Sequence, residues 1–475
     1  MQSSFTKRKK LGYCSGIVTE SLLYNMFYTY YLVFLTDVIK MDPILAGTVS
    51  FISIIWDAVT DPIIGSFADR NGSDKRKYMA KAAFPLGFMF IAAFVNIGAH
   101  SPAVQFIYYT AVTMLFWLAY TVYTIPYYAV VAEITQDYDE RTEIRSTSSL
   151  INTAAIFLGN ALPAVLPSLF AGLVFSGKKM GDSFGWTLTA IIMSVMSVLF
   201  ACITVKSLKG VMLQKAETVP SENERKSIKV IFSEFFEVLK IKPFKWFAMF
   251  IVFFLMASSM IQSSFEYMIK HLVNKDPETW MTVVIIELVV VMAAFIPLVT
   301  KIAETKDRRF SSILFMSLMC AGLIICRIIG VRSIIVVLAV TFCMAMGMAN
   351  FWTVFYSMAY DLVEVDEFAY GTRRESVITA LPQFFQKFGA AVGVWTVSLI
   401  LKLTGYNAEL AAQSAKTVNG IENNVTLIPA AFLVLSVIGA VMYPITREKF
   451  TLLNKELQKK RNGEKYSAEG LEKII

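Results

Sequence analysis

The sequence has little of what catalytic and metal sites are usually built from. Its 475 residues include only two histidines, His100 and His271, and five cysteines, with no CxxC or Cys-His cluster. Neither a disulfide framework nor a zinc site is expected, and an enzyme with a nucleophile–base or metal cluster is disfavoured. A GxxxxGK[ST] loop is also missing, because Gly177-Lys-Lys-Met-Gly-Asp182 does not match it. An ATP-driven pump is therefore excluded, and no cofactor is expected.

Charge is scarce and apolar sequence is abundant. Only 17% of the residues are charged, 56% are hydrophobic, and the mean hydropathy is +0.57. Apolar runs long enough to cross a bilayer recur from end to end, which predicts a polytopic membrane protein. The first run, 11–38, is too long and too polar in its middle for a cleavable signal, so we expect it to remain as the first spanning helix.

Twelve membrane spans are predicted, with loop charge that sets their orientation. They cover 11–38, 43–67, 78–98, 104–134, 146–171, 185–206, 244–269, 278–302, 310–329, 334–361, 377–403 and 425–445. Most lysines and arginines outside the spans fall in the loops of one side. By the positive-inside rule both termini are cytoplasmic. The net charge of +8 then faces anionic lipid, and no nucleic acid is needed to explain it.

A weak internal repeat indicates two halves. Arg141-x-Glu143 after the fourth span and Arg373-x-Glu375 after the tenth share one register. Parallel repeats are typical of two-halved transporters whose binding site lies between the halves. We predict an N-terminal six-helix half over 1–206, a cytoplasmic linker over 207–243, a C-terminal six-helix half over 244–445 and a cytoplasmic tail over 446–475.

Two aspartates inside an apolar helix are the most informative feature. Asp57 and Asp61 are four residues apart and so lie on one helix face. A carboxylate at membrane depth costs at least about 2.5 kcal/mol. The pair therefore needs a cation or a proton.

Several motifs together resemble one transporter family. They are Trp56-Asp57-Ala-Val-Thr-Asp61-Pro62, the stretch Asp69 to Lys77, Tyr123-Thr-Ile-Pro-Tyr-Tyr128, and the stretch Asp361 to Glu375. In this order and spacing they resemble the glycoside-pentoside-hexuronide:cation symporters, the melibiose-permease branch of the major facilitator superfamily. The resemblance runs from the first span to the twelfth. It implies an all-α membrane protein of twelve helices in two halves, a carrier that moves a sugar-like solute with sodium, lithium or a proton by alternating access, and a bacterial inner membrane as its location.

The resemblance also implies a cation site. Asp57, Asp61 and Thr121 fall at the positions where the family holds its cation, and Lys387 matches a lysine that takes part in coupling. Hard monovalent cations prefer oxygen ligands, so the residue types agree with this role. Sodium is the expected ion, with lithium or a proton as alternatives. The other interpretation is that the carboxylates pair with a buried base, for which Lys387 is available.

The substrate positions depart from melibiose permease. Ser21, Thr124, Tyr128 and Ser149 stand where that protein has two aspartates, a tryptophan and an arginine, and Glu20 precedes Ser21. Galactoside recognition is therefore in doubt, and another glycoside, a pentoside or an acidic sugar that uses Lys387 is expected. The candidate substrate-binding residues, with the matching aromatic platform first, are Trp352, Tyr128, Glu20, Thr124 and Ser149. For Glu20, a structural partnership with Lys81 or another polar group is an equal alternative.

The remaining charged residues have open roles. Arg141, Asp366, Arg373 and Glu375 are candidates for ion pairs that close the cytoplasmic side, the alternative being charge that only sets topology. Glu287 lies deep in the eighth span and serves either a proton path or a buried hydrogen bond. A non-transporting membrane sugar sensor on the same fold is the alternative function, although the tail predicts only a short basic amphipathic helix.

Overall fold

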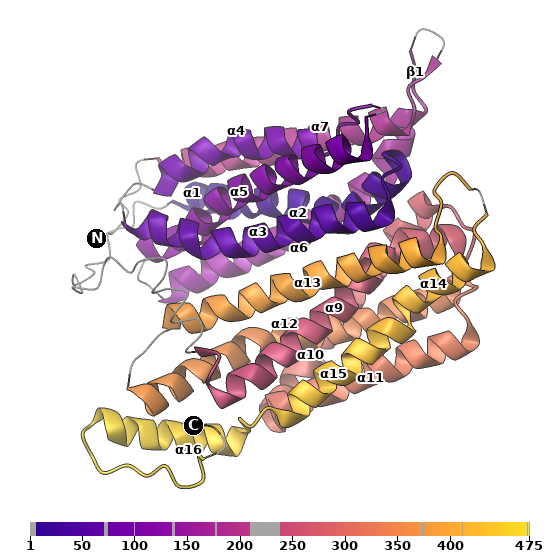
Figure 1. Cartoon of the computed structure of the whole chain (residues 1–475). Helices are drawn as coiled ribbons and strands as arrows, with labels where there is room; N and C mark the ends of the chain where they lie inside the picture. The colour runs from indigo at the N-terminus through magenta and orange to yellow at the C-terminus, as the bar shows by residue number, and fades with distance from the viewer. Residues whose placement is uncertain are drawn as a thin grey trace. The chain divides into compact units, whose positions relative to one another are not determined.

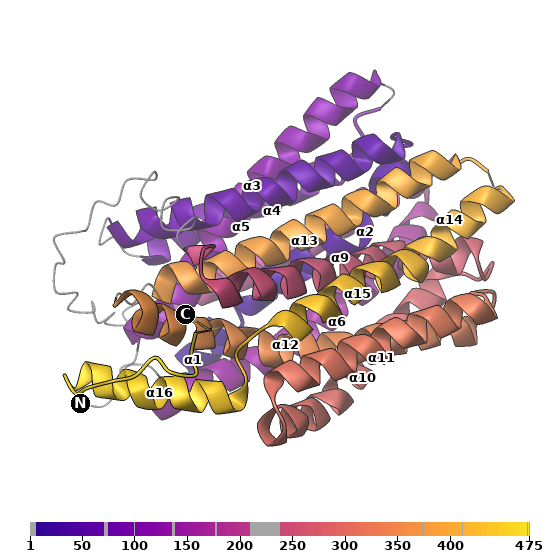
Figure 2. The ribbon, with the colours of Figure 1, turned by 60° about the horizontal axis from the view of Figure 1, so that its bottom comes forward.

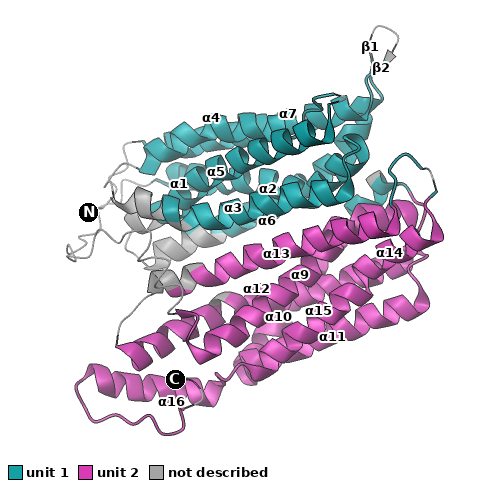
Figure 3. Ribbon diagram, viewed as in Figure 1, with its two compact units in different colours: residues 1–224, 276–285, 406–412 teal, residues 225–275, 286–405, 413–475 magenta. Residues whose placement is uncertain are grey.

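The protein is almost entirely helical. The computed structural model describes residues 6–70, 75–98, 100–134, 138–175, 178–209, 238–371, 375–410, 412–472 and 474. Figure 1 shows the helices in chain order. The described residues also contain a short antiparallel hairpin of two strands with two residues each, β1 (Val174–Phe175) and β2 (Lys178–Lys179). The chain divides into two compact units, which Figure 3 colours separately. Unit 1 comprises residues 1–224, 276–285 and 406–412, and unit 2 comprises residues 225–275, 286–405 and 413–475.

Unit 1 contains the helices of the N-terminal part of the chain. They are α1 (Lys7–Cys14), α2 (Ile17–Val33) with its π-helical continuation η1 (Phe34–Val38), α3 (Pro43–Arg70), α4 (Lys75–Ala93), α5 (Pro102–Ile134), α6 (Tyr138–Ala171) and α7 (Asp182–Ser207). α5 packs against α3 and α4, and α6 packs against α2 and α7. The contact of α6 with α7 requires a glycine, because a Cβ on Gly185 would collide with the carbonyl of Pro167. This packing places polar residues of α2, α3, α5 and α6 inside one unit.

Unit 2 is organised around its most buried helix. Its elements are α9 (Lys242–His271), α10 (Pro277–Thr305), α11 (Arg308–Ile329), α12 (Ile334–Tyr370), α13 (Glu375–Thr404), α14 (Ala415–Val425), α15 (Leu427–Met442) and α16 (Arg447–Arg461). The first residues of α10, up to Ile285, belong to unit 1. α9 lies between α13 and α15, as Figure 2 shows, and α11 packs against α12 and α15. The apolar surface of α9 is therefore covered by protein on two sides.

Each predicted span coincides with helix. Among the described residues, ten helices are long and apolar enough to cross a membrane, the last of them formed by α14 and α15 together. The first and third predicted spans, 11–38 and 78–98, are occupied by α1, α2 and η1, and by α4. α2 has only 17 residues, and α4 begins with three consecutive basic residues. The structure therefore confirms an all-α membrane protein, while the count of twelve spans stays a prediction.

The predicted linker falls largely outside the described residues. α7 ends at Ser207 and α9 begins at Lys242, and residues 210–237 are not described. The tail contains α16, which buries Leu453 and Leu457 and is joined to α12 by a bidentate contact of Arg461 with Glu367 at 2.6 Å. Within the tail, the ammonium of Lys459 and the backbone N–H of Ser467 lower the pKa of Glu456. The domain bounds themselves stay a prediction.

A buried glutamate ties α14 to the turn between α11 and α12. The Glu422 side chain is 2% exposed and accepts a hydrogen bond from the backbone N–H of Val331 at 2.9 Å. Arg327 and Arg332 each approach its carboxylate to 3.4 Å. α14 ends at a break in the helix at Thr426, where φ is −128° and ψ is −83°. Glu422 therefore attaches α14, the shorter of the two segments of a broken spanning helix, to the turn between α11 and α12.

Replacing Glu422 with alanine should destabilise unit 2 by about 1–3 kcal/mol, because the N–H of Val331 loses its buried acceptor. The arginines are partly exposed and can be hydrated, which keeps the cost within that range. We expect a lower midpoint of thermal inactivation in detergent. The control is Glu409→Ala, at an exposed glutamate that precedes α14, and it should leave the midpoint unchanged. Equal midpoints for the two variants would contradict the role of Glu422.

Candidate functional site

The structure brings the three predicted cation residues together. Asp57 and Asp61 lie on α3 and Thr121 on α5, and the Thr121 hydroxyl is 2.8 Å from Asp57 Oδ1 and 3.0 Å from Asp61 Oδ1. Asp57 is 1% exposed and Thr121 is fully buried. The two helices pack along much of their length, and this contact fixes the distances among the three side chains. Thr121 is 64 residues from Asp57 and 60 residues from Asp61 in the sequence, so only the fold brings the three side chains together.

A single hydroxyl cannot satisfy two carboxylates at once. Thr121 has one proton to donate, so at any moment one of the two carboxylates receives no hydrogen bond from it. Two tyrosines lie in the neighbourhood, Tyr28 near both aspartates and Tyr120 near Asp57. These are oxygen groups as well. The cluster can thus surround a bare monovalent cation or share a proton, and both chemistries reduce the repulsion between the carboxylates.

Glu20 and Ser21 face two different helices. Glu20 Oε2 accepts a hydrogen bond from the Tyr128 hydroxyl of α5 at 2.6 Å. Ser21 donates its hydroxyl to Asn152 Oδ1 of α6. Two of the candidate substrate residues, Glu20 and Tyr128, are therefore in contact. Asn152 was not predicted from the sequence, because nothing in its local pattern, Ser149-Leu-Ile-Asn152, distinguishes it from a packing residue.

The cation cluster and the Glu20–Tyr128 pair both use α5. Thr121 of the cluster and Tyr128 of the pair lie on this helix, seven residues apart, and residues at this spacing lie near one helix face. The two groups of residues are therefore neighbours along α5.

The contacts of the other candidate substrate residues do not indicate a role in binding. Thr124 is buried and its hydroxyl donates to the backbone carbonyl of Tyr120 at 2.9 Å, so it is satisfied within its own helix. Ser149 is exposed on α6. In unit 2, Trp352 is half-buried on α12, edge-on to Phe351 and Phe355, and Lys387 is half-buried on α13. Their roles stay predictions.

Of the four candidate gating residues, one is described at the level of its side chain. Asp366 is fully buried near the end of α12. Arg373 and the side chains of Arg141 and Glu375 lie outside the described residues. The gating assignments therefore stay predictions.

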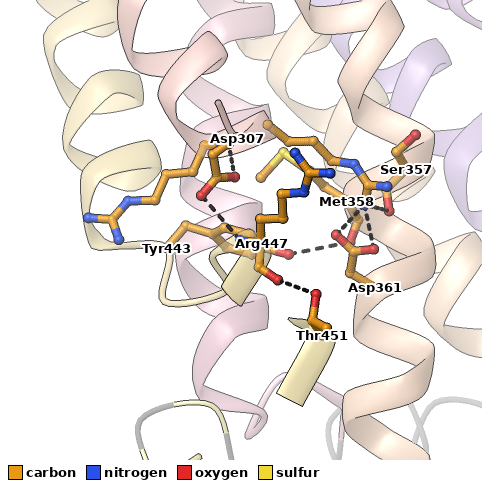
Figure 4. Close-up of polar contacts among 9 residues, drawn as sticks. Asp307, Ser357, Met358, Asp361, Tyr443, Arg447 and Thr451 are labelled. Carbon is orange, nitrogen blue, oxygen red and sulfur yellow. Dashed lines mark hydrogen bonds and ion pairs between the residues drawn. The ribbon is translucent and has the colours of Figure 1, made fainter. Parts of the chain in front are cut away.

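A charge pair that the sequence did not reveal lies at the end of unit 2 where α11 begins. Arg308 Nη1 is 2.5 Å from Asp361 Oδ1 and 2.6 Å from Oδ2. Asp361 lines a cavity of about 370 Å³ together with Asp307, Tyr443, Arg447 and Phe450 of α16. Figure 4 shows the polar contacts of this region. The pair ties the first residue of α11 to α12. Its partners are 53 residues apart, so no local pattern could have predicted it.

Glu287 lies in α10, in the segment that the sequence places deep in the membrane. It is half-buried, and its Oε2 atom is buried with no hydrogen-bond partner among the described residues. Cys343 of α12 lies in its neighbourhood. The predicted hydrogen bond to a neighbouring helix is not seen in the described part of the chain.

Ten helices of the described residues are long and apolar enough to cross a membrane, and one of them carries the buried Asp57 and the half-buried Asp61, as expected of a polytopic membrane protein that handles charge. The fold is that of the major facilitators. A bacterial homologue of the human lysosomal transporter Spinster, in an inward-facing conformation, is similar with a TM-score of 0.68 at 13% identity, over 96% of this chain and 99% of that chain. A D-xylose-proton symporter is similar with a TM-score of 0.60 at 13% identity, over 92% of this chain and 96% of that chain.

Residues 12–447 match the family model MFS/sugar transport protein, and the chain belongs to this family of glycoside-pentoside-hexuronide symporters. It is 27% identical to the uncharacterized symporter YnaJ of Bacillus subtilis, over 95% of this chain and 94% of that protein. It is 25% identical to the isoprimeverose transporter of Lactiplantibacillus pentosus, over 92% and 89%. The glucuronide carrier protein homolog of Escherichia coli is 21% identical over 97% of both. The protein is thus a transporter and not an enzyme.

Proposed function

We propose that this transporter is a sugar:cation symporter, with Asp57, Asp61 and Thr121 as the cation site. The observation that carries the proposal is the contact of the buried Thr121 hydroxyl with the carboxylates of both Asp57 and Asp61, which brings oxygen atoms of three side chains together as hard monovalent cations require. The names of relatives that share most of this chain's length, two of them symporters or sugar carriers, support the same class of function.

The coupling that we propose between cation and sugar starts from the charge of the Asp57–Asp61 pair. Binding of a cation neutralises one carboxylate of the cluster, whose Thr121 lies on α5, the helix that also carries Tyr128, the hydrogen-bond partner of Glu20. Glu20 and Tyr128 of unit 1 offer a carboxylate and a phenol to sugar hydroxyls. Trp352, with its aromatic face, and Lys387, with its positive charge, stay separate candidates for substrate contact. Because α5 carries residues of both groups, we propose that cation and sugar each raise the affinity for the other.

The proposal is tested with purified protein in lipid vesicles. A panel of labelled sugars is offered under an inward sodium gradient, an inward proton gradient, or none. A symporter accumulates at least one sugar above its external concentration only with a cation gradient. Binding of a sugar without any transport would instead identify the sensor.

Sodium or lithium should raise the affinity for the transported sugar at constant pH. Each ion can take the oxygen ligands of Asp57, Asp61 and Thr121, and the neutralised site stabilises the sugar-binding form. We expect a change of about tenfold in the sugar dissociation constant between zero and saturating sodium, as is typical of coupling energies between two sites. Potassium is the control ion. Affinity that ignores sodium but depends steeply on pH would assign the proton as the coupling ion.

A further inference from the structure

α10 carries a single charged residue within its apolar stretch. Residues 279–300 include Glu287 and no other aspartate, glutamate, lysine, arginine or histidine. With a mean hydropathy of 2.7, this span is the most apolar of the candidate spans among the described residues. Glu287 lies eight residues after Thr279, about 12 Å along the helix axis, and a hydrocarbon core is about 30 Å thick. It therefore lies well inside the membrane, where an ionised carboxylate is costly.

Glu287 lies near the side of α10 that meets α11 and α12. Phe295 follows it by eight residues and so lies near the same helix face. The Phe295 ring contacts Phe315 of α11 and Phe342 of α12, with ring centroids 6.3 and 5.6 Å apart. Cys343, the residue after Phe342, lies in the neighbourhood of Glu287. The buried part of the half-buried Glu287 side chain is therefore turned toward these two helices.

The parts of α11 and α12 at this depth carry no charge that could balance a carboxylate. Residues 310–326 of α11 and residues 334–360 of α12 contain no acidic residue and no lysine, arginine or histidine. The titratable groups that they bring to this place are two thiols, Cys343 and Cys326. A thiol is only a weak hydrogen-bond donor.

The basic residue next to Cys326 is engaged elsewhere. Arg327 donates to the side-chain oxygens of Asn419 at 2.6 Å and of Asn423 at 3.2 Å, and it approaches Glu422 to 3.4 Å. All three partners belong to α14. Among the described residues no charged side chain lies close to Glu287, and its Oε2 atom is buried without a hydrogen-bond partner.

A proton is the ligand that suits these surroundings. Hard cations require several oxygen ligands, whereas Glu287 brings one carboxyl group to two thiols. A carboxylate that is buried without a partner is neutralised by a proton more readily than it is kept charged. Glu287 differs in this respect from Asp57 and Asp61, which share the hydroxyl of Thr121 and can offer three side chains to a metal cation.

We infer that Glu287 is a proton-binding site separate from the cation site at Asp57 and Asp61, and that transport requires its protonated form. Ionisation would place an unbalanced charge at the contact of α10 with α11 and α12, which is made by apolar rings. The proton at Glu287 is bound in addition to the coupling cation. The role in transport rests on the proposed function, whereas the proton site itself does not.

Dicyclohexylcarbodiimide, an apolar reagent that enters the membrane, tests for the proton. The O–H of a protonated carboxyl group adds across one C=N bond of the reagent, so that the carboxyl oxygen bonds to the central carbon and the proton moves to nitrogen. The acyl group then moves from that oxygen to a nitrogen of the same adduct, which gives a stable N-acylurea with no leaving group. We expect mass spectrometry of the full-length protein, labelled in lipid vesicles and then digested, to find this adduct at Glu287.

The pH and the cation identify which carboxyl group reacts. The yield at Glu287 should fall as the pH is raised, because only the protonated form adds to the reagent. Saturating sodium should leave this yield unchanged, whereas any labelling of Asp57 or Asp61 should decrease. Glu304, which is exposed at the end of the same helix, is the internal control and should stay unlabelled where Glu287 reacts.

Variants test whether the proton matters for transport. Downhill exchange of p-nitrophenyl β-D-xyloside, β-D-glucoside or β-D-glucuronide, whichever the protein carries, is followed at saturating sodium, so that the cation site stays occupied at each pH. Exchange should fall about tenfold per pH unit once Glu287 is mostly ionised. Glu287→Gln, uncharged and similar in shape to the protonated acid, should exchange sugar equally across the pH range. Glu287→Asp should keep a dependence on pH, and the matched control Glu304→Gln should keep the wild-type profile.

The results bear on separate parts of the inference. The absence of an adduct at Glu287 at acidic pH would overturn the proton site. A Glu287→Gln profile that falls at alkaline pH as the wild type does would overturn its role in transport. If the protein carries no sugar at all, the proposed symport fails, while the labelling still decides whether Glu287 binds a proton.

Discussion

Asp57→Asn and Asp61→Asn should each abolish gradient-driven accumulation of sugar and leave downhill exchange in place. Each change removes one unit of negative charge and replaces one carboxylate oxygen next to Thr121 by an amide nitrogen, which cannot bind a cation. The cation then loses most of its electrostatic attraction, while the groups proposed to hold the sugar remain. We expect accumulation to fall to the level set by equilibration, measured as the ratio of internal to external labelled sugar.

Two comparisons make this result specific. Asp182→Asn, at an exposed acid in the first turn of α7, should accumulate sugar normally. Thr121→Ser keeps the hydroxyl and should retain coupling, whereas Thr121→Ala should weaken it. Wild-type accumulation in both aspartate variants would remove Asp57 and Asp61 from the proposed mechanism.

The cation cluster could be predicted because its information is local. Asp57 and Asp61 share a helix face at a spacing of four, and their charge is conspicuous in apolar sequence. Thr121 required the family resemblance, since a threonine in an aromatic helix carries no signal of its own. The packing of α3 on α5 then determines that the three oxygens meet.

The partners of Glu20 and Ser21 could not be predicted, because they depend on helix rotation. One residue changes direction by about 100° on a helix, so Glu20 faces α5 and Ser21 faces α6. Periodicity alone does not tell which neighbouring helix lies in each direction.

The end of the last predicted span also could not be predicted from hydropathy. The predicted span 425–445 follows the apolar run, whereas the structure continues the helix back to Ala415 through a polar segment with a break at Thr426.

Arg308→Ala should destabilise unit 2 more than Asp361→Asn, although both remove the same ion pair. The Asp361 side chain is 8% exposed, whereas the Arg308 side chain is 39% exposed. Removing the arginine leaves a buried carboxylate without its bidentate partner, which costs about 3 kcal/mol in comparable buried pairs. Removing the aspartate charge leaves a guanidinium that water can reach, so the cost is closer to that of a lost hydrogen bond, about 1 kcal/mol. The order is measured by thermal inactivation in detergent.

The exchanged pair, Arg308→Asp with Asp361→Arg, decides whether the attraction itself matters. If the two charges stabilise the contact of α11 with α12 through their attraction, the double variant should recover part of the stability that Arg308→Asp alone loses, because sites in direct contact are not additive. The recovery should be incomplete, since the longer arginine would start from the buried position on α12 and the shorter aspartate from the half-exposed position on α11. Strictly additive losses in the double variant would show that Arg308 and Asp361 act independently, Arg308 through its contact with the Ser357 carbonyl.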